Sequence, residues 1–413
     1  MTLGSHGDVQ PYVALGAALK SRGHDVTVTT GRGFEALIEG HGLKATAISD
    51  DVRQMIEDPL VQEAMNSLSG KIRAFRHFKG EVLRQLDESW AITRSVRPDI
   101  IVYHIKMSGA PAFAETLGIP ALPSFLMPGL VATSAYPSPL LPVPSLGRLG
   151  NLISHKAFLG LSGRLTTGLV GKWQRERLPG LSGPGDIFGG YDPSGRPATR
   201  LHAYSEHIVP KPKDWGARDQ VTGAWFLDEE TGWTAPDDLI RFLKAGEPPV
   251  YIGFGSMPGI NAGQNTAAVL GALERTGQRA ILATGWGGLD TVRVPDTVHI
   301  LDAAPHAWLF PRCSAVVHHG GAGTTHAGLR AGKPSLICPV AFDQPFWGRR
   351  VAALGAGPKP IPQKALGAEL LADALQAMRD PAMIARAEAL GAGIRKDPGT
   401  AAAVKIIERI AAR

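Results

Sequence analysis

Short runs of apolar residues recur along the chain, and most of them lead into a glycine-rich turn or a helical pattern. These runs predict strands at 25–29, 99–103, 120–123, 249–256, 279–284, 299–301, 315–318 and 334–338. Apolar residues at helical spacing predict helices at about 11–21, 110–117 and 267–275. Strands that alternate with helices are typical of parallel sheets made of βαβ units. The pattern therefore predicts an α/β protein.

The first strand of this pattern is unusually short. Only Thr2 and Leu3 separate Met1 from the polar glycine turn that starts at Gly4, whereas a buried strand commonly has about five residues. Two interpretations follow. Either the true start of the chain lies upstream of Met1, or the strand is short and the sheet loses a central partner.

The chain length predicts two domains. A chain of 413 residues is too long for one ordinary core and suits two domains of roughly 200 residues each. We place an N-terminal domain at 1–207, a proline-containing linker at 208–236 and a C-terminal domain at 237–413. The last helix of the C-terminal part is expected to pack back on the N-terminal domain.

The segment 124–200 differs from its surroundings. It is rich in Pro, Gly and Leu, shows no clean strand period, and has a loosely helical pattern between Leu146 and Leu178. We interpret it as loop and helix insertions over a pocket. Its apolar residues between Phe125 and Leu161 favour a hydrophobic ligand, although the same residues would also suit a domain core.

Composition and charge then narrow the class of protein. The net charge of +6 is spread thinly, without a run of five like charges, which argues against nucleic-acid binding. Cys313 and Cys338 lie in apolar stretches without CxxC spacing, as reduced core residues do. The N-terminus does not resemble a signal peptide, and no stretch of 18 apolar residues occurs. These features predict a cytoplasmic protein.

The clearest chemical motif is HHGGAGTT at 318–325, where a predicted strand passes into a helix. The free N–H groups of a helix N-terminus and the small residues around Gly321 and Gly323 allow phosphate oxygens to approach. His319 and the hydroxyls of Thr324 and Thr325 add donors. A plain tight turn would explain the glycines but not the paired His and Thr. No Gly-Lys-Ser/Thr and no complete GxGxxG fingerprint are present, so neither a P-loop nor a dinucleotide dehydrogenase is favoured.

Two carboxylates accompany this motif. Asp343 and Gln344 follow the next strand on the same sheet edge, and a carboxylate beside an amide can bind the vicinal hydroxyls of a hexose. Asp8 lies on the first glycine turn, where it can act as a general base. For both aspartates the alternative is a helix N-cap.

Several segments together resemble the family 1 glycosyltransferases of the GT-B fold. They are GSHGDVQP at 4–11, VTGAWFLD at 221–228, IGFGSM at 252–257, ATGWGG at 283–288, PHAWLF at 305–310, HHGGAGTT at 318–325 and FDQPFWG at 342–348. The sequence looks most like bacterial and fungal sterol 3-β-glucosyltransferases, with macrolide and glycopeptide-antibiotic transferases as relatives. This resemblance implies two Rossmann-like parallel-sheet domains that face each other across a cleft.

The resemblance also implies roles for individual residues. Asp8 and His6 are implied as catalytic residues, with Asp8 as the base in the place where plant relatives have a histidine. The implied donor-binding residues are Ser5 near the sugar and its phosphates, Ser256 at the diphosphate, Ala304 and His306 on the uracil and ribose side, His319, Gly321, Gly323, Thr324 and Thr325 at the phosphates, and Asp343 and Gln344 at the sugar hydroxyls.

The sequence departs from the family pattern at two positions. Many sterol-type members have Arg where His6 stands, which leaves the role of position 6 open. Ala303 stands where plant members stack a Trp on the uracil, so UDP is inferred from the family and not from a stacking residue.

The implied reaction is an inverting transfer of a hexose, with glucose favoured, from a UDP-sugar to a hydroxyl of a hydrophobic acceptor such as a sterol, polyketide or flavonoid. No DxD-like pair lies near the phosphate turn, so neither a metal nor another cofactor is expected. Two alternatives are a UDP-sugar 2-epimerase-like enzyme and a transferase that uses a dTDP-deoxysugar. A non-catalytic alternative is a membrane-surface protein that uses the weakly basic stretch from Lys156 to Arg177, and a weak peripheral membrane contact is compatible with the transferase as well.

Overall fold

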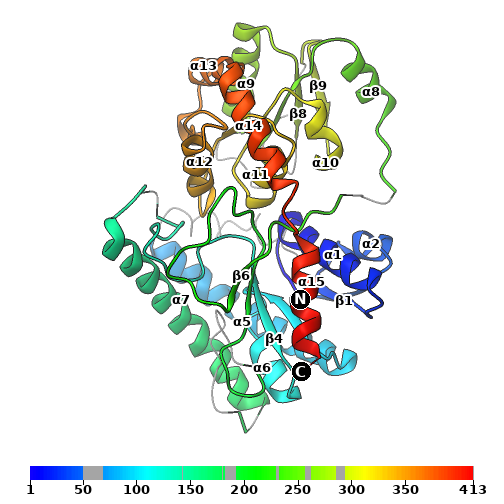
Figure 1. The fold of residues 1–413 in the computed structure, drawn as a ribbon, viewed down its shortest axis with the longest axis vertical. Helices are drawn as coiled ribbons and strands as arrows, with labels where there is room; N and C mark the ends of the chain where they lie inside the picture. Colours follow the sequence, from blue (N-terminus) through cyan, green and yellow to red (C-terminus); the bar gives the residue numbers. More distant parts are fainter. Residues whose placement is uncertain are drawn as a thin grey trace.

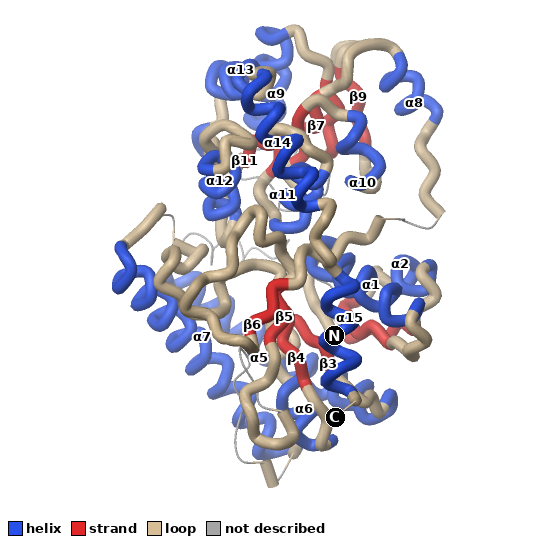
Figure 2. Tube along the Cα trace, viewed as in Figure 1, coloured by secondary structure: helices blue, strands red, loops and turns tan. Residues whose placement is uncertain are grey.

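The computed structural model consists of two α/β units that lie one above the other along the longest axis (Figure 1). It describes residues 1–49, 68–141, 143–178, 180–181, 192–228, 232–255, 262–284 and 294–412 of the chain. Ser256, which the motifs single out, lies outside these ranges. Figure 2 shows strands at the centre of each unit with helices around them. The predicted α/β class with two parallel-sheet domains is confirmed.

The N-terminal unit is the lower one in Figure 1 and contains residues from both ends of the chain. Its elements are α1 (His6–Ser21), β1 (Thr27–Gly31), α2 (Glu35–Gly40), β2 (Lys44–Ile48), α5 (Leu68–Val96), β3 (Ile101–His104), α6 (Ala110–Leu117), β4 (Ala121–Phe125), α7 (Gly147–Arg177), β5 (Arg200–His202) and β6 (Asp219–Val221). Strand β1 pairs in parallel with β2, and β3, β4, β5 and β6 form a parallel sheet in that order.

The first three residues of the chain connect these two sets of strands. The N–H of Thr2 donates to the carbonyl of Thr29 in β1 at 2.9 Å. On the other side, the N–H of His104 in β3 donates to the carbonyl of Met1 at 2.9 Å, and the Met1 ammonium donates to the carbonyl of Val102 at 2.7 Å. The short segment thus takes the place of a central strand. The sheet does not lose its central partner, contrary to one interpretation of the sequence.

Helices cover both faces of the N-terminal sheet. On one face, Tyr103 of β3 packs in a buried cluster with Phe113 of α6 and Trp173 of α7. On the other face, Leu122 of β4 shares a cluster with Val404 of α15. Successive residues of a strand point to opposite faces, so adjacent positions serve different cores. Because both faces are covered, the ends of the strands are left to carry loops with functional residues.

The C-terminal unit has one parallel sheet in the order β11-β10-β7-β8-β9. The elements from residue 237 onward are α8 (Asp237–Lys244), β7 (Val250–Gly253), α9 (Ala262–Thr276), β8 (Ala280–Ala283), β9 (Val298–Leu301), α10 (His306–Leu309), η1 (Phe310–Arg312), β10 (Ala315–His318), α11 (Ala322–Arg330), β11 (Ser335–Ile337), α12 (Gln344–Ala353), η2 (Gln363–Ala365), α13 (Ala368–Ala377), α14 (Pro381–Ile394) and α15 (Thr400–Ala411).

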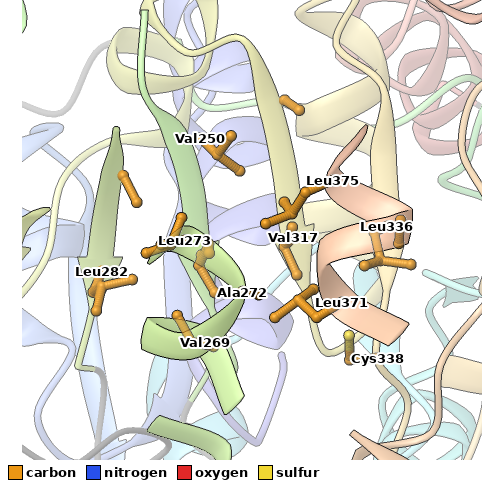
Figure 3. Packing of buried hydrophobic residues seen from close by; sticks show 14 of the residues in the cluster. Val250, Val269, Ala272, Leu273, Leu282, Val317, Leu336, Cys338, Leu371 and Leu375 are labelled. Carbon is orange, nitrogen blue, oxygen red and sulfur yellow. The ribbon is translucent and has the colours of Figure 1, made fainter. Parts of the chain in front are cut away.

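The core of this unit lies between the sheet and helices α9 and α13. Figure 3 shows Val250 and Val317 of adjacent strands facing Leu273 of α9 and Leu371 of α13. Tyr251, the neighbour of Val250, packs on the opposite face in a cluster with residues of α8 and α10. The strands are buried on both faces, which explains why they read as continuous apolar runs in the sequence.

A shared apolar cluster joins the two units. It contains Phe125, Tyr204 and Trp215 from the N-terminal part and Leu329, Phe346 and Trp347 from the C-terminal part. The chain also returns after α14 to the lower unit, where α15 lies beside α1 (Figure 1). There Arg22 Nε lies 3.1 Å from Glu408 Oε1. The two units are therefore packed together through buried side chains as well as through the connecting chain.

Two helices whose patterns the sequence indicated have other bounds than expected. Helix α1 begins at His6, about five residues before the predicted start, because the N–H of Ser5 donates to Asp8 Oδ2 at 2.8 Å in a capping-box arrangement. Asp8 therefore lies in the first turn of the helix and not in the loop before it. Helix α7 is continuous over 31 residues, where only a loose helical pattern was expected. Within the described residues, no helix is both long and apolar enough to cross a membrane.

Candidate active site

The HHGGAGTT segment forms the turn between β10 and α11. His318 ends the strand, Gly321 is the N-cap of the helix, and the N–H of Thr325 makes a 2.9 Å helical bond to the carbonyl of Gly321. Gly320 has φ +98°, and a Cβ atom there would lie 2.6 Å from Ile337 Cγ2, so a glycine is required. The first N–H groups of α11 have no intrahelical acceptors and are available to an anion.

The ring of His319 is held between two glycines. A Cβ atom on Gly255 would lie 2.6 Å from His319 Cε1, and one on Gly321 would lie 2.8 Å from His319 Nε2. Nδ1 of His319 is buried and has no hydrogen-bond partner among the described residues. Burial lowers the pKa of His319 to about 4, so the ring is neutral at pH 7. A buried ring nitrogen without a partner is suited to a ligand atom.

The two threonines of the turn are placed differently from each other. The hydroxyl of Thr325 is buried and donates to the carbonyl of Gly321 at 2.9 Å. Thr325 thus stabilises the helix start, and its contact with a phosphate stays a prediction. Thr324 is half-buried one residue closer to the helix N-terminus. His318, also buried, accepts at Nδ1 from the N–H of Gly320 at 3.0 Å and so shapes the turn.

Asp343 and Gln344 lie at the start of α12. Asp343 stands at the N-cap position, but its side chain makes no capping bond and instead accepts from Trp347 Nε1 at 2.7 Å. Burial raises the pKa of the Asp343 carboxyl. Gln344 Oε1 accepts from the N–H groups of Val340 at 2.7 Å and Ala341 at 3.2 Å, which fixes the plane of its amide. Both side chains are therefore oriented by their own neighbours before any ligand binds.

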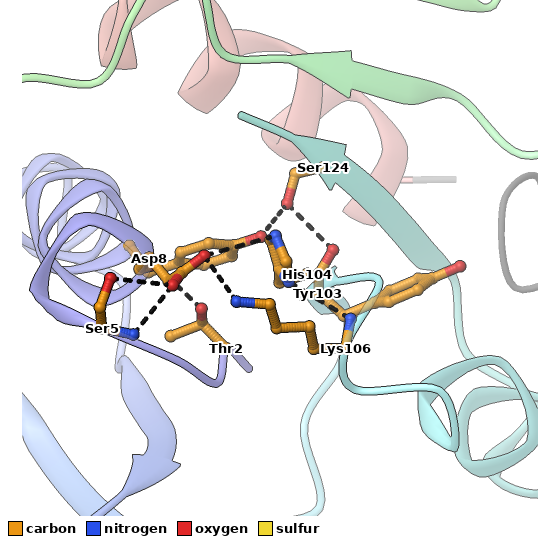
Figure 4. A network of polar contacts seen from close by, with 8 residues as sticks. Thr2, Ser5, Asp8, Tyr103, His104, Lys106 and Ser124 are labelled. Carbon is orange, nitrogen blue, oxygen red and sulfur yellow. Dashed lines mark hydrogen bonds and ion pairs between the residues drawn. The ribbon is translucent and has the colours of Figure 1, made fainter. Parts of the chain in front are cut away.

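Asp8 is the centre of a polar network in the N-terminal unit, which Figure 4 shows. Its Oδ2 accepts from the Ser5 N–H at 2.8 Å and from the Ser5 hydroxyl at 3.2 Å. Its Oδ1 lies 3.0 Å from Lys106 Nζ and 3.9 Å from His104 Nε2. Burial alone would raise the pKa of Asp8, but Lys106, His104 and Ser5 together hold it below its usual value. Asp8 is therefore a carboxylate at neutral pH.

The sequence motifs did not indicate the other residues of this region, which are Tyr12 of α1, His104 and Lys106 at the end of β3, and Ser124 of β4. Burial lowers the pKa of His104 to about 4, so its ring is neutral. The hydroxyls of Tyr12 and Ser124 lie 2.6 Å apart, and Ser124 donates to the carbonyl of Tyr103 at 3.0 Å. The available signal was position, because the segment that contains Lys106 follows a strand of the same parallel sheet, at the end where ligands commonly bind.

The residues of the two units act on one another electrostatically. Asp8 raises the pKa of Asp343, and Lys106 lowers it. Burial lowers the pKa of His306 to about 4, and the nearby His6 and His319 contribute to this lowering. The ring of His306 stacks on Phe310 with centroids 4.3 Å apart, close to Ala304 in the same turn. His6 itself is exposed, with its ring 6.4 Å from that of Phe34. Two sets of residues from different units thus influence one another, namely Asp8 and Lys106 with Asp343, and His6 with His306.

This fold and this site define the GT-B class of glycosyltransferases. Residues 1–137 match the glycosyltransferase family 28 N-terminal domain, and residues 268–410 match the C-terminal domain of erythromycin biosynthesis protein CIII-like proteins. The chain is 36% identical over 417 residues to the sterol 3-beta-glucosyltransferase UGT80A2 of Arabidopsis thaliana, covering 98% of this chain and 64% of that protein. It is 33% identical to UGT80B1 of the same plant, covering 99% and 67%.

The chain belongs to the family of GT-B glycosyltransferases that includes these sterol 3-beta-glucosyltransferases. A sterol 3-beta-glucosyltransferase of Cryptococcus neoformans is 35% identical, and the match covers 99% of this chain and 27% of that protein. The chain thus spans about two thirds of the plant relatives and about a quarter of the fungal one.

Solved structures share the fold over nearly the whole chain. The glycotransferase of kitacinnamycin has a TM-score of 0.72 at 20% identity, covering 98% of this chain and 97% of that one. The glycosyltransferase VinC in complex with dTDP has a TM-score of 0.69 at 19% identity, covering 100% and 99%. The resemblance inferred from the sequence motifs is confirmed.

Proposed function

We propose that this protein is an inverting glycosyltransferase that moves a hexose, with glucose favoured, from a UDP-sugar to a hydroxyl of a hydrophobic acceptor. The main support for the proposal is that each unit contributes polar groups to the candidate active site. An ionised carboxylate, Asp8, lies in the N-terminal unit within electrostatic reach of Asp343 at the anion-binding edge of the C-terminal unit. The curated relatives are named sterol 3-beta-glucosyltransferases, which supports both the reaction and the acceptor class.

The proposed reaction is a single displacement. A carboxylate oxygen of Asp8 takes the proton from the acceptor hydroxyl while the hydroxyl oxygen forms a bond to the anomeric carbon. The bond from that carbon to the diphosphate oxygen breaks on the opposite face, and its electron pair leaves with UDP. The anomeric centre is inverted in one step, and the proton on Asp8 is later released to solvent.

The C-terminal unit, proposed as 237–413, binds the donor in this scheme. The first turn of α11 and the ring of His319 face the diphosphate and stabilise the charge that grows on it. Other proposed donor contacts are Ser5, Ser256, Ala304, His306, Gly321, Gly323, Thr324, Asp343 and Gln344. We propose that this arrangement works without a bound metal ion. The N-terminal unit, proposed as 1–207, binds the acceptor, and the linker at 208–236 lets the units close.

A panel of donors and acceptors tests the proposal. UDP-glucose, UDP-galactose and dTDP-glucose are each offered with a sterol, a polyketide and a phenol, and the products are detected by mass. We expect an adduct of one hexose with at least one hydrophobic acceptor and a preference for UDP-glucose. Preference for a dTDP donor would correct the nucleotide. Conversion of UDP-sugar to a free 2-epimer without acceptor, and no adduct in any mixture, would overturn the proposal.

The surface of α7 supports a further proposed partner, an anionic lipid bilayer. Five of the eight large apolar side chains exposed among the described residues lie between 141 and 161. Leu149 and Leu161 are the most exposed of them, at 71% and 65%. Lys156, Arg164 and Lys172 of the same helix are also exposed, and no acidic residue occurs from 147 to 175. Exposed leucines together with basic side chains and no acidic ones would suit contact with an anionic membrane surface.

This surface begins next to the candidate active site. Arg349 of α12 donates to the carbonyl of Leu141 at 3.2 Å, and the ring of Tyr136 lies 5.6 Å from that of Phe346. The chain that leads into α7 is thus attached to the helix that starts at Gln344. An acceptor dissolved in a bilayer would be presented close to the region between the units.

Vesicle sedimentation tests this contact. The wild type should sediment with phosphatidylcholine vesicles that contain phosphatidylglycerol, and less with phosphatidylcholine alone. The combined change Leu149→Ser, Ile153→Ser and Leu161→Ser should abolish sedimentation, whereas Leu370→Ser, at a leucine of α13 that is 52% exposed, should not. Absence of binding by the wild type, or dimerisation that the triple variant removes, would show that lipid is not the partner of this face.

A further inference from the structure

Lys106 approaches the catalytic carboxylate at a place where the backbone makes room for it. Its Nζ lies 3.0 Å from Asp8 Oδ1, and its side chain is 46% exposed. Gly4 has φ +138°, and a Cβ atom there would lie 2.2 Å from Asp8 Oδ2 and 2.6 Å from Lys106 Nζ. Any other residue at position 4 would therefore collide with both charged groups. The glycine allows the ion pair to form against the backbone.

The two oxygens of Asp8 are held from different parts of the chain. Oδ2 is held by Ser5, at the start of the same helix, while Oδ1 faces Lys106, almost 100 residues later. Of the other titratable groups around Asp8, His104 and Tyr12 are both neutral at pH 7, because burial lowers the pKa of His104 to about 4 and raises that of Tyr12. Lys106 thus supplies the positive charge at this carboxylate.

A second carboxylate faces the same region from the other unit. Asp8 raises the pKa of Asp343, and Lys106 lowers the pKa of both carboxyls. A nucleotide diphosphate would bring further negative charge into the same space. Negative charges that gather in one region disfavour ionisation of each carboxyl unless a cation offsets them, and Asp8 would lose its function as a base if it took up a proton.

We propose that Lys106 is a positioning residue that keeps Asp8 ionised and oriented while a negatively charged donor and Asp343 lie opposite. This inference rests on the proposed glycosyl transfer with Asp8 as base. Lys106 acts through Asp8 and does not exchange a proton itself. In its absence, burial dominates at Asp8, and the carboxyl then takes up a proton at a higher pH.

The pH dependence of kcat/KM tests the role of Lys106. The wild-type profile should stay flat from about pH 5 to about pH 8, while the acid limb of Lys106→Met should move up by about 1–2 pH units. Lys106→Arg should restore most of the wild-type profile, because it keeps the charge. Lys405→Met, at an exposed position on α15, is the matched control and should leave the profile unchanged. Equal profiles for Lys106→Met and the wild type would overturn the proposal.

A titration without turnover separates this inference from the proposed reaction. Carbon-13 labelling of the aspartate carboxyls allows the Asp8 signal to be assigned by its loss in Asp8→Asn. The pKa of Asp8 read from that signal should rise by about 1–2 units in Lys106→Met and return towards wild type in Lys106→Arg. If the pKa of Asp8 rises in Lys106→Met but no sugar transfer is found, the proposed function is wrong and the effect of Lys106 on Asp8 is confirmed. An unchanged Asp8 pKa would refute the role of Lys106 even in an active enzyme.

Discussion

The two halves of the candidate site are built in different ways. In the C-terminal unit each functional group lies within a single strand-to-helix turn, as His319 does between β10 and α11 and Asp343 does before α12. In the N-terminal unit the base is assembled from distant segments, since Asp8 meets Lys106 from the end of β3. A local turn leaves a continuous motif in the sequence. An assembled site leaves only isolated residues, and its chemistry depends on the fold.

The largest effect on turnover is expected in the N-terminal unit, where Asp8 lies. Asp8→Asn keeps the size of the side chain but removes the proton acceptor, so kcat should fall by about 100-fold to 10,000-fold. Turnover is measured by UDP release with saturating acceptor. Asp25→Asn, at an exposed aspartate of the same unit, should keep wild-type turnover. Near-normal turnover of Asp8→Asn would show that another residue is the base. The contrast drawn between the two units would then be wrong.

The local half should show a smaller effect on turnover. His319→Ala removes a buried ring from the turn, and kcat/KM for the donor should fall by about 100-fold because charge on the leaving diphosphate loses a partner. The rate at low donor concentration gives this value. His41→Ala, away from both half-sites on the N-terminal unit, serves as the control. If His319→Ala changed only the KM for the acceptor, the assignment of this turn to the donor would be wrong.

The sequence predicted the C-terminal half more completely than the N-terminal one. Strands β7, β8, β10 and β11 fall within the predicted apolar runs and β9 begins one residue before its run, because strands buried on both faces carry little but apolar residues. The start of α1 was predicted too late, since Gly4 and Gly7 indicate a turn while the cap formed by Ser5 and Asp8 decides the helix. Helix α5 was missed. Lys106 was not predicted, because a single lysine after a strand has no motif of its own.

The next prediction concerns Trp347, whose indole N–H holds the carboxylate of Asp343 at 2.7 Å. Trp347→Phe keeps an aromatic ring in the buried cluster but removes the donor, so Asp343 loses its orientation. The KM for the UDP-sugar should rise by about 10-fold, which corresponds to the loss of one hydrogen bond to a charged group. Trp308→Phe is the matched tryptophan outside this contact. An unchanged donor KM in Trp347→Phe would show that the indole does not orient the sugar site.

A pH prediction tests whether the two halves unfold as one body. Burial lowers the pKa of His104 in one unit and of His326 in the other to about 4, against about 6.5 in an unfolded chain. The unfolded chain therefore takes up protons first as the pH falls. The stability that these neutral histidines provide is complete above about pH 6.5 and is lost towards about pH 4. Urea unfolding at pH 5 should give one transition with a free energy of unfolding several kcal/mol below that at pH 7.

Two results would contradict that prediction. A free energy of unfolding that stays level between pH 7 and pH 5 would mean that the buried histidines are already protonated or solvated in the folded chain. Two separate transitions would mean that the cluster around Phe346 and Trp347 does not couple the units. The second result would show that the two units unfold independently in spite of the shared cluster.

The smallest expected effect is that of metal removal. If the N-terminus of α11 and His319 stabilise the leaving diphosphate, EDTA should change kcat by no more than about twofold. The assay uses protein dialysed against EDTA, with and without added Mg²⁺ or Mn²⁺. A loss of activity that Mg²⁺ or Mn²⁺ restores would replace the proposed role of the turn with that of a metal ion.

The binding of UDP to three proteins tests the division of labour between the halves most directly. Isothermal titration gives the Kd of UDP for the wild type, Asp8→Asn and His319→Ala. Asp8→Asn, although inactive in transfer, should bind UDP within about threefold of the wild type, whereas His319→Ala should bind it at least about 10-fold more weakly. Equal loss of UDP affinity in both variants, or a loss confined to Asp8→Asn, would contradict this account. It assigns donor binding to the C-terminal unit and proton removal to Asp8 of the N-terminal unit.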